Sequence, residues 1–121
     1  MSRNMTKDER RLLLKLVGDD FPDLRVLHSQ IEACQAIDLI EDEIIEFEVT
    51  SPQRFKVRSE TLGEGSFRDV DNVPIIITLL QRNGCLWHLD IYRADGQPVK
   101  TRIDPEKVRT LGYGQGLTLE D

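Results

Sequence analysis

The sequence has no long apolar segment, and this absence excludes a membrane-spanning helix. No stretch approaches the roughly 18 consecutive apolar residues that such a helix needs. The first eleven residues, MSRNMTKDERR, are polar and lack the apolar centre of a secretory signal. We therefore expect a cytoplasmic protein without a membrane partner.

Cysteine is also scarce, with only Cys34 and Cys85 among 121 residues. Without a secretion signal, we expect both thiols to be reduced. Two isolated cysteines in apolar surroundings are typical of small core side chains. No second Cys or His lies at ligand spacing from either one, so the sequence predicts no zinc site.

No glycine motif predicts a cofactor. Residues 61–72 have the composition of a loop, and their Gly63-Glu64-Gly65 is too short for a phosphate-binding loop and lacks its Lys. Three further glycines in residues 112–116 follow a predicted helix rather than a strand, which favours a flexible tail. We expect no cofactor.

Positive charge is deficient in the first half of the chain. The formal net charge is −6, and residues 1–50 hold 6 Lys and Arg against 12 Asp and Glu, whereas residues 51–121 hold 10 of each. An acidic protein repels the phosphate backbone, so we expect no nucleic-acid partner. The excess of acid suits a basic protein partner, or plain solubility.

Two helices are predicted near the N-terminus. Residues 6–9, Thr-Lys-Asp-Glu, fit a capping box. Apolar residues at helical spacing follow and predict a helix over residues 7–17. After a turn, Pro22 suits a first helical turn, and the next apolar residues recur at spacings of three and four. They predict a second helix over about residues 22–34.

Alternating side chains next predict a hairpin. Residues 45–49 and 55–57 alternate apolar and charged side chains around a Ser51-Pro52-Gln53 turn. A three-residue loop brings two glutamates opposite two basic residues on a solvated face. The pairs are Glu48 with Lys56 and Glu46 with Arg58. This register favours cross-strand ion pairs over an acidic binding strip.

Asn83-Gly84, between two apolar runs, is the strongest hairpin signal in the chain. A two-residue loop places Leu80 opposite Trp87 and predicts that this face turns toward the core. The opposite face then carries three polar or aromatic residues of the second strand beside three aliphatic residues of the first. These are His88, Asp90 and Tyr92, beside Ile75, Ile77 and Leu79.

The predicted fold class is α+β: two N-terminal helices packed on an antiparallel sheet of four to five strands built from hairpins. Asp104-Pro105-Glu106 adds the start of a short C-terminal helix that runs to about Leu111. We expect one domain over residues 1–121, with residues 1–5 and 112–121 flexible.

A sequence pattern runs from Phe21 to Pro105, about two thirds of the chain. Phe21-Pro22 opens a helix, and Asp71-Asn72-Val73-Pro74 leads into an apolar strand, with Asn72 where glycine is common. The later positions of the pattern are Leu86, Leu89, Asp90, Ile91, Tyr92, Arg93, Asp95, Gly96 and Pro98. This order of signals resembles an uncharacterised family of small bacterial proteins. The resemblance implies no reaction and no catalytic residue. In size, acidity and hairpin content the chain also resembles immunity proteins that neutralise bacterial toxins.

We therefore expect a small acidic protein-binding module, an immunity-type inhibitor of a toxin domain, rather than an enzyme. Acidic residues without local ion partners would raise the rate of encounter with a basic partner. These are Asp19, Asp20, Glu41, Asp42 and Glu43. The expected contact residues are His88, Asp90 and Tyr92.

Two alternatives stay open. A small enzyme could use His88 as a general base that Asp90 orients. An accessory domain without catalytic activity could instead self-associate through the aliphatic residues beside them, which must be covered by something. Those residues are Ile75, Ile77 and Leu79.

Overall fold

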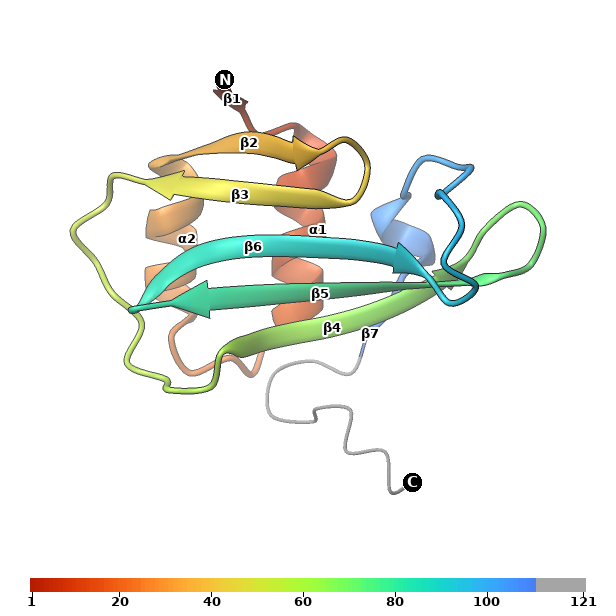
Figure 1. Cartoon of the computed structure of the whole chain (residues 1–121). Helices are drawn as coiled ribbons and strands as arrows, with labels where there is room; N and C mark the ends of the chain where they lie inside the picture. Colours follow the sequence, from red (N-terminus) through yellow and green to blue (C-terminus); the bar gives the residue numbers. More distant parts are fainter. Residues whose placement is uncertain (111–121) are drawn as a thin grey trace.

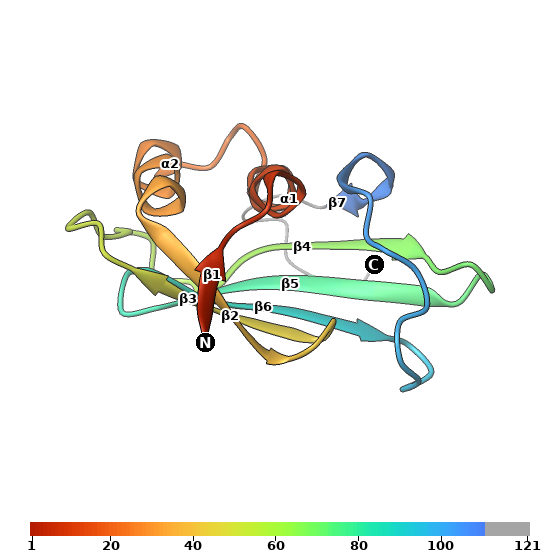
Figure 2. The ribbon, with the colours of Figure 1, turned by 90° about the horizontal axis from the view of Figure 1, so that it is seen from above.

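In the computed structural model, which describes residues 1–110, the chain forms one antiparallel sheet with helices on one face (Figure 1). The strand order is β1-β2-β3-β6-β5-β4-β7. Seen from above, both α-helices lie on the same side, and no helix of the described chain covers the other side (Figure 2). The elements are β1 (Ser2–Asn4), α1 (Lys7–Val17), α2 (Leu24–Glu32), β2 (Cys34–Ile40), β3 (Ile44–Val49), β4 (Thr61–Arg68), β5 (Pro74–Arg82), β6 (Cys85–Arg93), the 3-10 turn η1 (Pro105–Lys107) and β7 (Arg109–Thr110).

The predicted fold class is wrong. The protein is mostly sheet, with seven strands rather than four to five. The predicted C-terminal helix is replaced by η1, followed by β7, which pairs with β4. The Asp104 side chain does accept from the Glu106 amide, but residues 108–110 are extended. The end of that predicted helix at Leu111, and the predicted flexible tail of residues 112–121, lie outside the described residues.

Helix α1 has the bounds that the sequence predicts. Thr6 accepts a hydrogen bond from the Glu9 amide, and Glu9 accepts from the Thr6 amide, so the capping box is present. The apolar stripe of the helix is buried against the sheet, through Leu12, Leu13, Leu16 and Val17. Helix α2 is shorter than predicted and begins at Leu24, and the Asp23 carboxylate before it accepts from the amides of Lys56 and Val57 rather than from its own helix.

Strand β4 lies where the sequence predicts a loop. Gly63 and Gly65 face α1 at its closest approach to the sheet, and a Cβ on Gly63 would overlap the Leu16 carbonyl oxygen. The two glycines therefore serve close packing between a helix and a strand, not flexibility. The loop prediction for residues 61–72 is wrong up to Arg68.

The predicted hairpin between residues 45–49 and 55–57 does not form. Strand β3 pairs with β2 and β6, and residues 50–60 run as a loop along one end of the sheet. Two buried glutamines bind that loop. Gln30 donates to the carbonyl oxygens of Gln53 and Gly84, and Gln81 donates to those of Val57 and Ser59. These bonds satisfy the loop backbone that a strand ladder would otherwise satisfy.

The turn of the β5–β6 hairpin is confirmed, and Leu89 and Ile91 of β6 face the core as predicted, but the predicted phase of β5 is wrong. Asn83 (φ 54°) and Gly84 (φ 80°) take the left-handed conformations of a tight hairpin turn. A β-bulge then shifts the register, so that Leu80 faces His88 instead of Trp87. The aliphatic side chains predicted on the open face are in the core: Ile75, Ile77 and Leu79 are fully buried.

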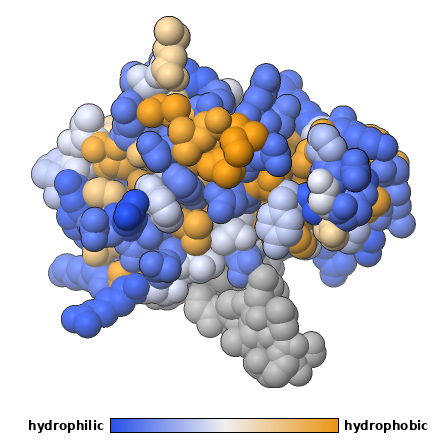
Figure 3. Space-filling model, in the orientation of Figure 1, coloured by the Kyte–Doolittle hydropathy of each residue, from blue (hydrophilic) through white to orange (hydrophobic). Residues whose placement is uncertain are grey.

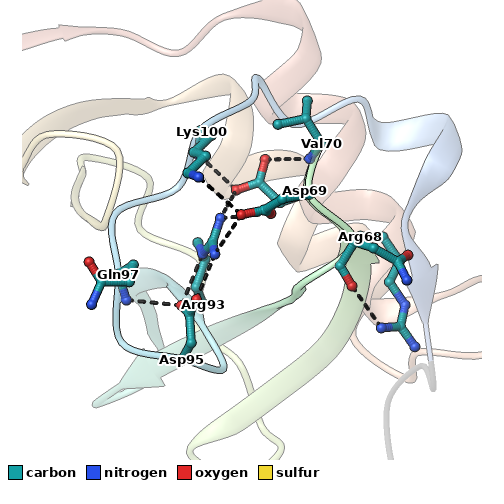
Figure 4. Close-up of polar contacts among 9 residues, drawn as sticks. Arg68, Asp69, Val70, Arg93, Asp95, Gln97 and Lys100 are labelled. Carbon is teal, nitrogen blue, oxygen red and sulfur yellow. Dashed lines mark hydrogen bonds and ion pairs between the residues drawn. The ribbon is translucent and has the colours of Figure 1, made fainter.

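One buried arginine ties the β4–β5 loop to the turn after β6 (Figure 4). Arg93, at the end of β6, binds Asp69 and Asp71 in the β4–β5 loop and Asp95 in the turn after β6, at 2.6–3.0 Å. These hydrogen bonds lower the pKa of Asp71 and of Asp95 to about 2. Asn72 has φ 68°, the left-handed conformation that glycine favours. We refer to Arg93 and its three carboxylate partners, Asp69, Asp71 and Asp95, as the Arg93 cluster. Asp71, Arg93 and Asp95 also belong to the sequence pattern that resembles the uncharacterised family, so these positions of the pattern have a structural role.

Candidate binding face of the sheet

The open face of the sheet, opposite the helices, is the strongest candidate for a functional surface. Side chains alternate along each strand, so every second residue points to this face. The outward residues in the centre of the sheet are Ile44, Glu46, Glu64, Ile76, Thr78, Leu80, His88, Asp90 and Tyr92. We refer to these residues as the outer face.

His88 lies at the centre of the outer face, between two carboxylates. Its Nε2 lies 3.1 Å from Oε1 of Glu46 on β3. Its Nδ1 lies 3.9 Å from Oδ1 of Asp90, which is beyond hydrogen-bond distance. The bulge places the Trp87 ring against the His88 ring, with centroids 3.9 Å apart, and the guanidinium of Arg82 lies over the indole at 4.8 Å. Stacking on one side and Glu46 on the other hold the imidazole in place.

Asp90 lies on β6 itself, and Glu64 on β4 adds a third carboxylate to the outer face. Thr78, opposite Asp90 in the ladder, donates to Oε2 of Glu64 at 3.2 Å. Burial raises the pKa of Glu64, against the effect of this hydrogen bond. The Oδ1 atom of Asp90 is buried and has no hydrogen-bond partner in the described structure. Within residues 1–110, neither these two carboxylates nor Glu46 forms an ion pair with Lys or Arg.

Apolar side chains border this acidic centre. Figure 3 shows an apolar group over the β2–β3 part of the face, surrounded by hydrophilic residues. Leu39 and Ile40, at the end of β2, are about half exposed, as is Tyr92 at the end of β6. The outer face therefore combines unpaired acid with aliphatic and aromatic surface, a composition typical of protein interfaces.

The structure separates the predicted site residues into three groups. Asp19 and Asp20 lie in the turn between α1 and α2, on the helix side. Glu41, Asp42 and Glu43 form the turn between β2 and β3, where Asp42 has φ 63°. The third group consists of His88, Asp90 and Tyr92. It is the only one of the three groups that lies on the outer face.

Sequence reasoning missed Glu46, Glu64 and Thr78 as neighbours of this group. The sequence pairs Glu46 with Arg58 and predicts a loop around Glu64, so it places neither residue beside His88. The alternation of residues 44–49 does show that Glu46 points away from the core. Only the strand order, with β3 next to β6, brings it to the imidazole.

The described residues offer no conventional metal centre. Among residues 1–110, no three His, Cys, Asp or Glu side chains are grouped as metal ligands. Both cysteines are free thiols, and burial raises the pKa of Cys34 to about 11. Neither α-helix of the described chain has the length and apolarity that crossing a bilayer requires.

The fold and the outer face define a small single-sheet protein with a helix-covered side and an open acidic side. The chain belongs to the family described as a domain of unknown function, DUF6984, which matches residues 2–103. The predicted membership of an uncharacterised family is thereby confirmed. No curated protein and no solved structure matches the chain significantly.

Proposed function

We propose that this protein is a binding module whose outer face receives a basic, partly apolar segment of a protein partner. The observation that carries the proposal is the Oδ1 atom of Asp90, which is buried without a donor. A desolvated carboxylate oxygen without a hydrogen bond is costly, and charged donors form the strongest bonds to it. The Asp90 side chain as a whole is 36% exposed, so a lysine or arginine of a partner would pair with this carboxylate from its open side.

The surroundings of Asp90 support the same partner chemistry. Glu46 and Glu64 extend the negative charge across β3 and β4, and no Lys or Arg within residues 1–110 pairs with either. Tyr92 and the aliphatic residues at the border would supply the desolvated anchors from which most interface affinity comes. The net charge of −6 would speed encounter with a basic partner. An immunity-type inhibitor of a basic toxin domain is the form of this function that we favour.

The proposal is tested with the protein encoded by the neighbouring gene. The two proteins are mixed and separated by size exclusion at low and at moderate salt. The test variant is Glu46→Gln with Asp90→Asn, and the control is Glu32→Gln, at an exposed residue that ends α2. We expect co-elution of the wild type and the control, and loss of co-elution in the test variant at moderate salt. Separate elution of the wild-type pair in both conditions, or equal binding by the test variant, contradicts the proposal.

A second variant separates steering from contact. Asp19→Asn with Asp20→Asn removes two charges on the helix side, away from the outer face. We expect it to lower the association rate at low salt and to leave the dissociation rate unchanged, because steering acts before contact. A faster dissociation rate in this variant would place the contact on the helix side instead.

A further inference from the structure

A hollow of about 360 Å³ lies where β4, β5, β7 and η1 meet, at the end of the strand order opposite to β1. Its lining consists of Ser66, Phe67, Arg68, Pro74, Lys107 and Arg109. Three of these six residues are cations, and none is a carboxylate. In a chain of net charge −6, this lining is a local reversal of charge.

The strand ladder brings the two arginines of the lining to the same side of the sheet. Arg109 lies opposite Ser66, and residues that are opposite each other share a face. Arg68 lies two residues after Ser66 on β4, so it points the same way. Gly65, next to Ser66, faces Leu16 of α1. The hydroxyl and the two guanidinium groups therefore lie on the side of the sheet away from the helices.

The three cations are not neutralised by the rest of the described chain. Within residues 1–110, none of them forms an ion pair. Arg68 donates from Nη1 to the carbonyl oxygen of Asn72 at 2.9 Å, which holds the guanidinium and leaves its other N–H groups available. The adjacent carboxylate, Asp69, binds Arg93 instead, and Arg68 extends away from the Arg93 cluster (Figure 4). The hollow thus keeps its full positive charge.

We infer that this hollow binds a phosphate monoester group. Such a group carries a charge of about −2 at neutral pH, which suits three cations better than the single charge of a carboxylate does. Each guanidinium can bind two phosphate oxygens at once. The Ser66 hydroxyl, which has no hydrogen-bond partner among residues 1–110, adds a neutral donor.

The surroundings of the hollow favour one phosphate group over a chain of them. Glu64 lies two residues before Ser66 on the same side of β4 and would repel further phosphates, as would the acidic centre of the outer face. The ligand is therefore a single phosphate monoester, not a nucleic-acid backbone. This site does not depend on the proposed function, because a phosphate group needs neither the partner protein nor Asp90.

The probes are glycerol phosphate and a short capped peptide that carries one phosphoserine. Each is titrated into the full chain at neutral pH and constant ionic strength, and binding is followed by amide NMR. We expect saturable shifts of the amide signals of Ser66, Arg68 and Arg109. Tighter binding of glycerol phosphate would assign the phosphate to a small molecule, and tighter binding of the peptide would assign it to a phosphorylated protein. Both results support the site.

Two variants test the cations. Arg68→Gln with Arg109→Gln should weaken binding by at least about threefold, because two charge contacts at the surface are lost. Lys107→Gln changes an exposed side chain that has no contact to lose in the described chain, so the fold is kept, and it should weaken binding by about twofold. The control, Arg25→Gln with Lys56→Gln, removes two exposed cations outside the hollow and should bind as the wild type does.

Three outcomes overturn the inference: no shifts with either probe, equal affinity for acetate, or unchanged affinity in the two test variants. Equal affinity for acetate would show a positive surface without a phosphate site. The titration contains no partner protein, and the variants that test partner binding lie outside the hollow. Failure of this inference is therefore distinguishable from failure of the proposed function.

Discussion

The Nε2 atom of His88 lies 3.1 Å from Oε1 of Glu46, although 42 positions separate the two residues in the sequence. A carboxylate can only accept, so the ring nitrogen that faces Glu46 carries the proton. The other ring nitrogen, Nδ1, lies 3.9 Å from Oδ1 of Asp90, which is beyond hydrogen-bond distance. The bond that fixes His88 therefore leaves Asp90 without a donor from its nearest neighbour, and this is why we assign the missing donor to a partner.

The first prediction concerns the cost of Asp90 in the free protein. Asp90→Asn removes the charge from a partly desolvated carboxylate and lets the amide donate to its surroundings. We expect the free energy of unfolding to rise by about 1 kcal/mol, while partner binding weakens. Urea unfolding at neutral pH measures the first effect. Glu48→Gln, on the same face but exposed, is the matched control and should be neutral. A destabilised Asp90→Asn variant would show that the free fold already satisfies this side chain.

The second prediction concerns acid stability, which depends on the Arg93 cluster. The folded-state pKa values of Asp71 and Asp95 are lowered to about 2, below their unfolded values. Groups with a depressed folded pKa stabilise above the unfolded pKa and lose that contribution as pH falls through the folded value. We therefore expect the free energy of unfolding to drop between about pH 4 and pH 2.

The Asp95→Asn variant tests that assignment. It should be less stable than the wild type at neutral pH, and it should lose less stability over the same acidic interval. Glu32→Gln, at an exposed residue outside the cluster, is the control and should follow the wild-type profile. Urea midpoints at neutral and acidic pH give the comparison. If Asp95→Asn keeps the full acid sensitivity, the sensitivity arises elsewhere.

The third prediction concerns the contact between α1 and β4. Gly63→Ala places a methyl group against the Leu16 carbonyl, so the helix must move away from the sheet. We expect a loss of about 1–3 kcal/mol or more. Gly96→Ala is the matched control, because its Cβ meets no atom within 4 Å and its cost comes only from φ 76°. Equal losses in the two variants would mean that α1 does not pack closely on β4.

Local signals in the sequence predicted the parts of the fold that depend on local chemistry. The capping box of Thr6 and Glu9 determines where α1 begins, and Asn83-Gly84 determines the turn between β5 and β6. Both features can be predicted from a few neighbouring residues. The bulge at Trp87 is different, because one unpaired residue shifts the phase of a strand without changing its composition. The error moved Ile75, Ile77 and Leu79 to the wrong face.

Long-range contacts decided the remaining differences. Residues 55–57 alternate like a strand, but Asp23, Gln30 and Gln81 bind this loop by its backbone from elements distant in the sequence. The glycines of β4 are typical of a loop in the sequence, and only the position of α1 shows that they allow the helix to pack closely on the strand. In the outer face, the shared side of His88, Asp90 and Tyr92 follows from their spacing of two, whereas the contact with Glu46 follows only from the strand order.

The most direct test of the central proposal maps the partner onto the protein. The protein, labelled for amide NMR, is titrated with the protein encoded by the neighbouring gene, and signal changes are assigned residue by residue. We predict that the largest changes fall on Glu46, His88, Asp90 and Tyr92, and that α2 is unaffected. Changes centred on α1 and α2, with the outer face unperturbed, would contradict the assignment of the binding face.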